Sequence, residues 1–148
     1  MMLHAGLENR RSAARARPQD YSGPRVVVCG TTDCGKSTLC KMLLNWAVRA
    51  GMVGDCSRRM PMFVDTDVGQ NDITLVGCLA ARIVESVTPI GVEEAERQQR
   101  ELPLNEPLAL WFGSSSPSND PSLFLYLLEV LAAYCNQKMK NDPICSFM

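Results

Sequence analysis

A glycine-rich stretch that ends in a lysine and a serine is the part of this chain with the clearest capacity for chemistry. Residues 30–38 read GTTDCGKST and fit the phosphate-binding pattern G-x-x-x-x-G-K-[ST]. In that pattern the glycines let successive backbone N–H groups turn toward phosphate oxygens, and the start of a helix adds its positive dipole end. We therefore expect Lys36 to reach the β- and γ-phosphates of a nucleotide and Ser37 to offer its hydroxyl to Mg²⁺.

The predicted phosphate-contacting residues form one continuous segment. They are Gly30, Thr31, Thr32, Asp33, Cys34, Gly35, Lys36, Ser37 and Thr38. A thiol beside a lysine and a helix start can gain thiolate character, although a small loop-filling role for Cys34 is the favoured interpretation.

Two aspartates follow the next apolar run and could supply carboxylates to the same nucleotide. The segment Pro61–Asp67 is typical of a buried strand that leads into a turn over residues 68–70. Side chains in a strand alternate, so Asp65 and Asp67 emerge on one face near its carboxyl end, where open α/β sheets bind ligands. We expect Asp67 to serve the Mg²⁺-bound nucleotide, whereas Asp65 is equally well explained as a loop cap.

These residues require strands and helices that alternate along the chain. The expected elements are a strand over Arg25–Gly30, a helix over Lys36–Ala50 capped by Gly51, a strand over Pro61–Asp67, strands or a hairpin within Ile73–Val84, a charged helix over Glu93–Glu101, a core strand over Leu108–Phe112, and a helix from Pro121 to about Lys140 with Asp120 as N-cap. Trp46, Trp111, Phe112 and Phe124 are interpreted as core packing rather than base-stacking surfaces. Unbroken apolar strands suit a parallel sheet covered on both faces, so the fold class is α/β.

Composition narrows the functional classes. The chain has 148 residues, 46% of them hydrophobic, and a formal net charge of −1, which fits one globular domain and argues against a general nucleic-acid coat. Seven cysteines without a C-x-x-C pair, and a single histidine, leave little support for a zinc finger or a histidine-dependent hydrolase. The cysteines suggest a reduced, intracellular protein. No apolar run approaches the ~18 residues that cross a bilayer, so no membrane partner is expected.

The N-terminal residues 1–24 are basic and admit three interpretations. Arginines at positions 10, 11, 15 and 17 stand among alanines, as in a mitochondrial presequence or a nuclear-localisation patch. A solvated linker is the favoured interpretation.

Several motifs together resemble one family. The segments at residues 30–38, 63–70 (FVDTDVGQ), 73–78 (ITLVGC) and 107–113 (PLALWFG) are similar to the Clp-type polyribonucleotide 5′-hydroxyl kinases. Residues 4–11 are similar to the stretch that joins that family's N-terminal domain to its kinase domain. The resemblance implies a P-loop NTPase three-layer sandwich with a mainly parallel sheet. It also implies that residues 1–24 are the remnant of that junction and that residues 25–148 are a kinase domain incomplete at its C-terminus.

The resemblance also implies a reaction. Residues 30–38 would bind ATP, and Asp67 would activate the 5′-hydroxyl of an RNA and help Ser37 hold Mg²⁺. Gln70 is implied to orient the nucleophile. Ser114, Ser115 and Ser116 occupy the position of a substrate loop, although a plain strand-to-helix connection explains them equally well.

The family's setting gives the expected partners and location. Its members belong to the nuclear pre-mRNA 3′-end cleavage and polyadenylation complex and, in some lineages, to tRNA splicing complexes. Residues expected from the family's lid lie beyond Met148, and lid arginines can be worth ~10³ in rate. A catalytically weak, ATP-bound scaffold of that complex is therefore the alternative, and a third interpretation is an unrelated P-loop GTPase or ATPase switch.

Overall fold

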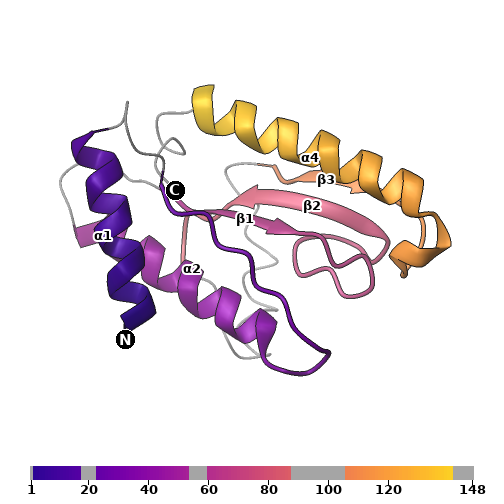
Figure 1. Ribbon diagram of the computed structural model, residues 1–148, viewed down its shortest axis with the longest axis horizontal. Helices are drawn as coiled ribbons and strands as arrows, with labels where there is room; N and C mark the ends of the chain where they lie inside the picture. Colours follow the sequence, from indigo (N-terminus) through magenta and orange to yellow (C-terminus); the bar gives the residue numbers. More distant parts are fainter. Residues whose placement is uncertain (1, 18–22, 54–59, 88–105, 142–148) are drawn as a thin grey trace.

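A small antiparallel sheet with a long helix across one face forms the centre of the molecule (Figure 1). The computed structural model describes residues 2–17, 23–53, 60–87 and 106–141. Its elements are α1 (Met2–Ala16), α2 (Lys36–Val53), β1 (Met62–Asp65), β2 (Cys78–Ile83), β3 (Leu108–Trp111), the 3₁₀ turn η1 (Pro117–Asn119) and α4 (Pro121–Asn141). None of the described helices is long and apolar enough to cross a membrane.

The sheet has the order β1-β2-β3, and both neighbouring pairs are antiparallel. Asp65 pairs with Ala80, and Cys78 pairs with Trp111. The prediction of a mainly parallel sheet is therefore wrong for the described residues. Residues 66–77 return the chain directly from β1 into β2, and a direct return can join only antiparallel strands, because parallel neighbours need a long crossover.

The core lies between the sheet and α4. Its buried members come from β2, α4 and the residues that follow β1 and β3: Val68, Leu79, Ala81, Phe112, Leu131 and Cys135. The rings of Phe112 and Phe124 meet edge to face, with centroids 5.6 Å apart. The predicted helix from Pro121 and its cap are confirmed, since the Leu123 N–H donates to Asp120 Oδ1 at 2.9 Å.

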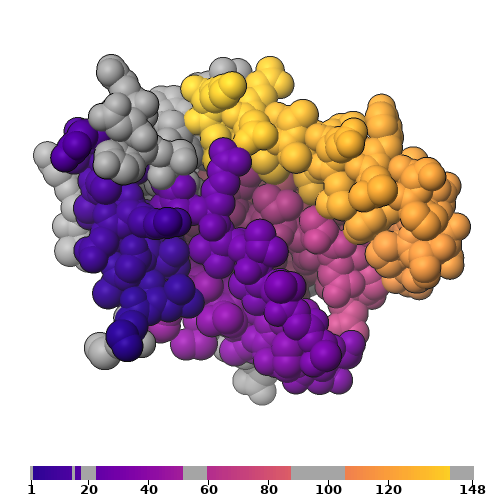
Figure 2. Space-filling model, in the orientation of Figure 1, coloured from indigo at the N-terminus to yellow at the C-terminus, as the bar shows by residue number. Residues whose placement is uncertain are grey.

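The segment that precedes the phosphate loop departs from its prediction. Residues 25–30 belong to no strand, and Val27 is 88% exposed, so the expected buried strand Arg25–Gly30 is wrong here. Apolar residues favour an extended backbone, but a strand also needs a neighbour to pair with, and β1–β3 pair only among themselves. Figure 2 shows this purple segment at the surface of the molecule.

The helix after the loop is longer than predicted. It continues past the expected cap at Gly51 as far as Val53. A glycine cap takes a positive φ, and among the described glycines that conformation occurs at Gly35, Gly77 and Gly113 instead.

Part of the basic N-terminal segment is helical. Helix α1 packs against α2, where the ring centroids of His4 and Trp46 lie 5.0 Å apart. Leu7 and Ala14 of α1 are buried. The division at residue 24 stays a prediction, and the predicted helix Glu93–Glu101 lies outside the described residues.

Candidate functional site

The phosphate loop closes on itself before α2 begins. Asp33 and Gly35 adopt positive φ values of 59° and 86°, which curl the backbone. The Lys36 ammonium donates to the carbonyl oxygen of Thr31 at 2.7 Å, so it spans the loop from its end to its start. The Leu39 N–H makes the first helical bond, to Gly35 O at 3.0 Å. The lysine is thus held over the loop, where a bound phosphate would compete for its protons.

The two motif glycines are required for different reasons. A Cβ at Gly30 would stand 2.9 Å from the sulfur of Cys34, closer than real Cβ contacts come. A Cβ at Gly35 would meet no atom within 4 Å, but its φ of 86° is strained for any L side chain. Cys34 therefore fills the space above Gly30, which agrees with its predicted role as a loop filler.

The loop is open to an anion. Residues 30–35, Ser37 and Thr38 are exposed, and the first turn of α2 contains no acidic residue. The first N–H groups of a helix have no partner within the helix, so the start of α2 offers unpaired donors and a positive dipole end. The predicted phosphate-binding residues are thus brought together in one exposed, cation-bearing loop.

Asp65 organises the turn that follows β1. Its Oδ1 accepts the N–H of Asp67 at 2.9 Å, and its Oδ2 accepts the N–H of Asp72 at 2.7 Å. Burial raises the pKa of Asp65, and the negative charges of Asp72 and Asp67 raise it further, while the two backbone bonds lower it. Both of its oxygens are used to join the two ends of the turn, which supports the loop-cap interpretation.

Asp67 lies exposed at the start of the same turn. Its Oδ1 accepts the N–H groups of Gly69 at 2.9 Å and Gln70 at 3.1 Å. These two bonds orient the carboxylate and fix the backbone of Gln70 beside it. Asp67 therefore combines a defined orientation with access to solvent, as a residue that receives a substrate must.

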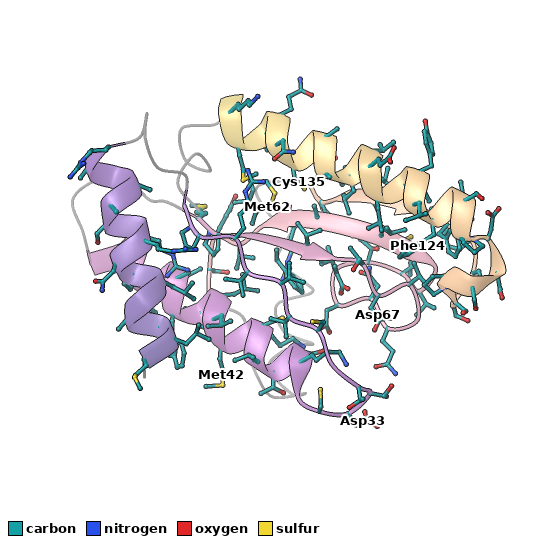
Figure 3. All side chains as sticks on the ribbon, in the orientation of Figure 1. Asp33, Met42, Met62, Asp67, Phe124 and Cys135 are labelled. Atoms are coloured by element: carbon teal, nitrogen blue, oxygen red, sulfur yellow. The ribbon has the colours of Figure 1, made fainter. Side chains whose placement is uncertain are left out.

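Helix α2 contacts the connection between β1 and β2, residues 66–77, which we call the Asp67 turn. The Lys41 ammonium lies 3.2 Å from Asp72 Oδ1. The pKa of the Cys40 thiol is raised by burial first, and then by the charges of Asp65 and Asp72. Ser37 stands one helical turn before Lys41 and so shares its face of α2. Figure 3 shows Asp33 and Asp67 at the same end of α2.

The serine loop lies against the other side of the Asp67 turn. A Cβ at Gly69 would stand 3.1 Å from the carbonyl oxygen of Ser115 and 3.3 Å from Asp67 Oδ1. Ser114 Oγ accepts the side-chain amide of Asn119 at 2.6 Å, and Ser116 Oγ lies 2.7 Å from Ser118 Oγ. The hydroxyls of Ser114 and Ser116 thus serve the connection to η1, which supports the predicted strand-to-helix role, and the substrate-loop role stays a prediction.

Sequence reasoning missed two features of this region. The first is the Lys41–Asp72 ion pair. Lys41 stands four residues after Ser37, and this spacing indicates that Lys41 lies on the same face of the helix as Ser37. The second is Trp111, which is 66% exposed, so its predicted core role is wrong. Trp111 lies on the sheet face opposite α4, at the edge strand, where alternation alone does not reveal what covers a side chain.

The donor set suits one cation. Within the described ranges, no group of three His, Cys, Asp or Glu side chains comes together as a metal site. Mg²⁺ does not need such a cage, because it is commonly bound by one or two protein oxygens together with phosphate and water. The Ser37 hydroxyl and the Asp67 carboxylate are oxygen donors of that kind.

Comparison with known proteins gives one consistent result. Residues 30–146 match the family described as mRNA cleavage and polyadenylation factor CLP1 P-loop. A relative named Protein CLP1 homolog, from Arabidopsis thaliana, is 38% identical over 145 residues, which are 95% of this chain and 29% of the relative. Relatives named Polyribonucleotide 5′-hydroxyl-kinase Clp1 are 39% identical in Gallus gallus and 37% identical in Homo sapiens, each over 91% of this chain and 28% of the relative. The chain therefore spans less than a third of the length of these relatives.

Proposed function

The chain belongs to the mRNA cleavage and polyadenylation factor CLP1 P-loop family, and from this we propose that it binds ATP and transfers the γ-phosphate to the 5′-hydroxyl of an RNA. The observation that carries the proposal is the contact between the helix of the phosphate loop and the Asp67 turn, made through Lys41 and Asp72. The printed names of the relatives support the reaction class. Family membership removes the alternative of an unrelated GTPase or ATPase switch.

The phosphate loop binds and orients ATP in this proposal. Backbone N–H groups of residues 30–38 contact the phosphates, and Lys36 exchanges its bond to Thr31 O for β- and γ-phosphate oxygens. The ammonium keeps its charge and its three N–H donors throughout that exchange. Positioning and charge, rather than covalent chemistry, are what phosphoryl transfer demands of a protein.

Ser37 and Asp67 would hold Mg²⁺ through their side-chain oxygens. When bound, the cation neutralises negative charge on the phosphate oxygens. The contact between α2 and the Asp67 turn keeps the two donors on facing elements.

The Asp67 turn receives the RNA in this proposal. Asp67 accepts the proton of the 5′-hydroxyl as the hydroxyl oxygen attacks the γ-phosphorus in line, while the bond from that phosphorus to the β–γ bridging oxygen breaks and ADP leaves. The bonds from Gly69 and Gln70 fix the orientation of the carboxylate. Gln70 orients the nucleophile, and the loop formed by Ser114, Ser115 and Ser116 contacts the RNA.

The cellular setting is part of the same proposal. We place the protein in the nucleus, with the subunits of the pre-mRNA cleavage and polyadenylation complex as partners. Residues 1–24 then link the kinase domain, from residue 25, to a preceding domain.

An ATP-bound scaffold without turnover is the second candidate. The unpaired segment before the loop favours it, because Val26 and Val27 remain exposed and the loop lacks the support of a sheet. A loop anchored mainly through α2 can bind phosphate yet place it too loosely for efficient transfer.

Transfer of radiolabel separates the two candidates. We expect label from [γ-³²P]ATP to appear on a 5′-hydroxyl RNA, and Lys36→Ala and Asp67→Asn to lower the rate by about 10²-fold or more. Lys140→Ala and Glu129→Gln, both exposed on α4, are the matched controls and should transfer at the rate of the unaltered chain.

The remaining outcomes are equally distinct. ATP that protects the chain against thermal unfolding without any transfer supports the scaffold. Both candidates are contradicted if ATP does not protect the chain against unfolding and no label reaches the RNA.

A further inference from the structure

An exposed indole lies beside the Asp67 turn and has no role in the proposed transfer. Trp111 ends β3 and remains 66% exposed, whereas Phe112, the next residue, is 6% exposed in the core. An aromatic ring that is exposed beside a candidate site offers a face on which a ligand can stack.

The protein supports this ring from one side. A Cβ at Gly77 would stand 3.2 Å from Cζ3 and Cη2 of the indole, and a Cβ at Gly113 would stand 3.2 Å from its Nε1. Both glycines adopt positive φ values, 88° and 85°, and the N–H groups of Phe112 and Gly113 donate to Gly77 O. The indole therefore lies against the hydrogen-bonded backbone of Gly77 and Gly113, and the rest of the ring faces solvent.

Two exposed apolar residues precede Gly77, the glycine that lies against the ring. Leu75 and Val76, next to Gly77 in the chain, are 75% and 54% exposed. The net charge of the whole chain is −1, so it offers few cations to attract phosphates in general. A nucleic acid that binds here must gain affinity from its bases more than from its backbone.

A short chain of contacts joins the ring to the turn that carries Asp67, the proposed proton acceptor. Gly77 donates its N–H to the carbonyl oxygen of Val68 at 2.8 Å, and Val68 directly follows Asp67 in the sequence. A Cβ at Gly77 would also stand 3.7 Å from the backbone nitrogen of Ser114, and the Ser115 carbonyl lies against Gly69. The indole and the Asp67 carboxylate thus flank one small backbone unit.

We propose that Trp111 is a stacking platform for an unpaired nucleobase near the 5′ end of the RNA substrate. The proposal rests on the proposed function, which places the 5′-hydroxyl at Asp67. Stacking on an aromatic face is tolerant of base identity but requires the base to be unpaired. The site therefore selects single-stranded 5′ ends and contributes little sequence preference.

Intrinsic fluorescence tests the platform directly, because the chain has two tryptophans. In a Trp46→Phe background, Trp111 is the remaining emitter. We expect a single-stranded 5′-hydroxyl oligoadenylate to quench its emission. The same oligonucleotide with abasic ribose at its first positions should leave the emission unchanged, as should a blunt duplex.

Affinity measurements with matched variants complete the test. We follow the anisotropy of the oligoadenylate labelled at its 3′ end. Trp111→Leu keeps an apolar side chain without a stacking face, so we expect binding to weaken about tenfold, while Trp111→Phe stays within about threefold. Tyr126→Leu, at a similarly exposed aromatic (62%) on α4, should bind as the unaltered chain does.

The outcomes separate this proposal from the proposed function. RNA binding without quenching of Trp111, or binding that Trp111→Leu leaves unchanged, overturns the platform and indicates a protein-docking surface instead. Absence of any RNA binding also overturns it. A chain that shows quenching but no transfer of label retains the platform and refutes the kinase activity. Thermal unfolding of Trp111→Leu, with and without ATP, confirms that the variant is folded.

Discussion

The phosphate loop and the sheet beneath α4 stabilise their shapes by different means. The contacts of the loop join near neighbours in the sequence: Lys36 bonds to Thr31, and Cys34 lies over Gly30. The core of the sheet joins distant residues, such as Val68 and Leu131, and excludes water from both. The loop is exposed and polar, whereas the sheet is held by burial of apolar surface.

This difference explains why the contacts that shape the phosphate loop lie within the motif, whereas the segment before it depends on distant residues. The contacts of the loop that join Lys36 to Thr31 and Cys34 to Gly30 lie within the motif. The extended segment before it depends on a partner strand, and residues 25–30 have none among β1–β3. The candidate site therefore joins a locally determined half, the loop, to a half that depends on tertiary packing, the Asp67 turn.

A cavity in the core should affect the sheet far more than the loop. Leu131 is 1% exposed between α4 and the sheet, so Leu131→Ala should lower the free energy of unfolding by about 2–5 kcal/mol. Urea unfolding followed by far-ultraviolet circular dichroism measures the loss. Leu125→Ala, at a site on the same helix that is 60% exposed, is the control and should cost less than about 1 kcal/mol. Equal losses in the two variants would contradict the assignment of the core.

Substitution of the loop glycines should do the reverse. Gly30→Ala places a Cβ against the Cys34 sulfur and Gly35→Ala strains a positive φ, so each should weaken ATP binding about tenfold or more, while strain of about 1–2 kcal/mol leaves the sheet folded. Calorimetric titration with ATP measures the affinity.

Removing the sulfur distinguishes the two causes. Cys34→Ala should restore ATP binding to Gly30→Ala, because the clash is with the thiol, but should not restore it to Gly35→Ala. Rescue of both variants, or of neither, would show that the two glycines are required for a common reason.

The elements that were predictable from the sequence are those determined by local residues. The start of α2 at Lys36 and the Asp120 cap of α4 each follow from a few adjacent side chains, and both are confirmed. The strands at Met62–Asp65 and Leu108–Trp111 were also located correctly. Their pairing was not, because apolar runs specify burial and leave the direction of the neighbouring strand open.

The site shows the same division between local and distant information. The motif predicts the loop residues, yet the proximity of Lys41 to Asp72 depends on how α2 docks beside the turn. The exposure of Trp111 depends on what covers the face of the sheet opposite α4, which no property of residues 108–113 determines.

The cap of α4 gives a smaller, local effect within the sheet region. Asp120→Ala removes the acceptor of the Leu123 N–H and should lower the free energy of unfolding by about 1 kcal/mol. Asp120→Asn keeps a side-chain oxygen at the same position and should cost less. Affinity for ATP should be unchanged in both variants, since α4 lies across the sheet from the loop; a large loss of ATP binding would mean that the two regions are more strongly coupled than their contacts suggest.

The contact between the two regions should give the smallest effect, and the reactivity of Cys40 can report it. The charge of Asp72 raises the pKa of this thiol, so Asp72→Asn should lower the pKa and increase the thiolate fraction at a fixed pH below it. Burial and Asp65 raise this pKa more than Asp72 does, so we expect iodoacetamide to alkylate Cys40 faster by less than about fivefold. Peptide mass spectrometry assigns the modification to Cys40. Lys41→Gln breaks the same ion pair but leaves the charge of Asp72 beside the thiol, so it should not accelerate the reaction. If both substitutions accelerate it, the ion pair keeps α2 docked against the turn, and the two halves of the site are joined by that pair rather than by the packing around it.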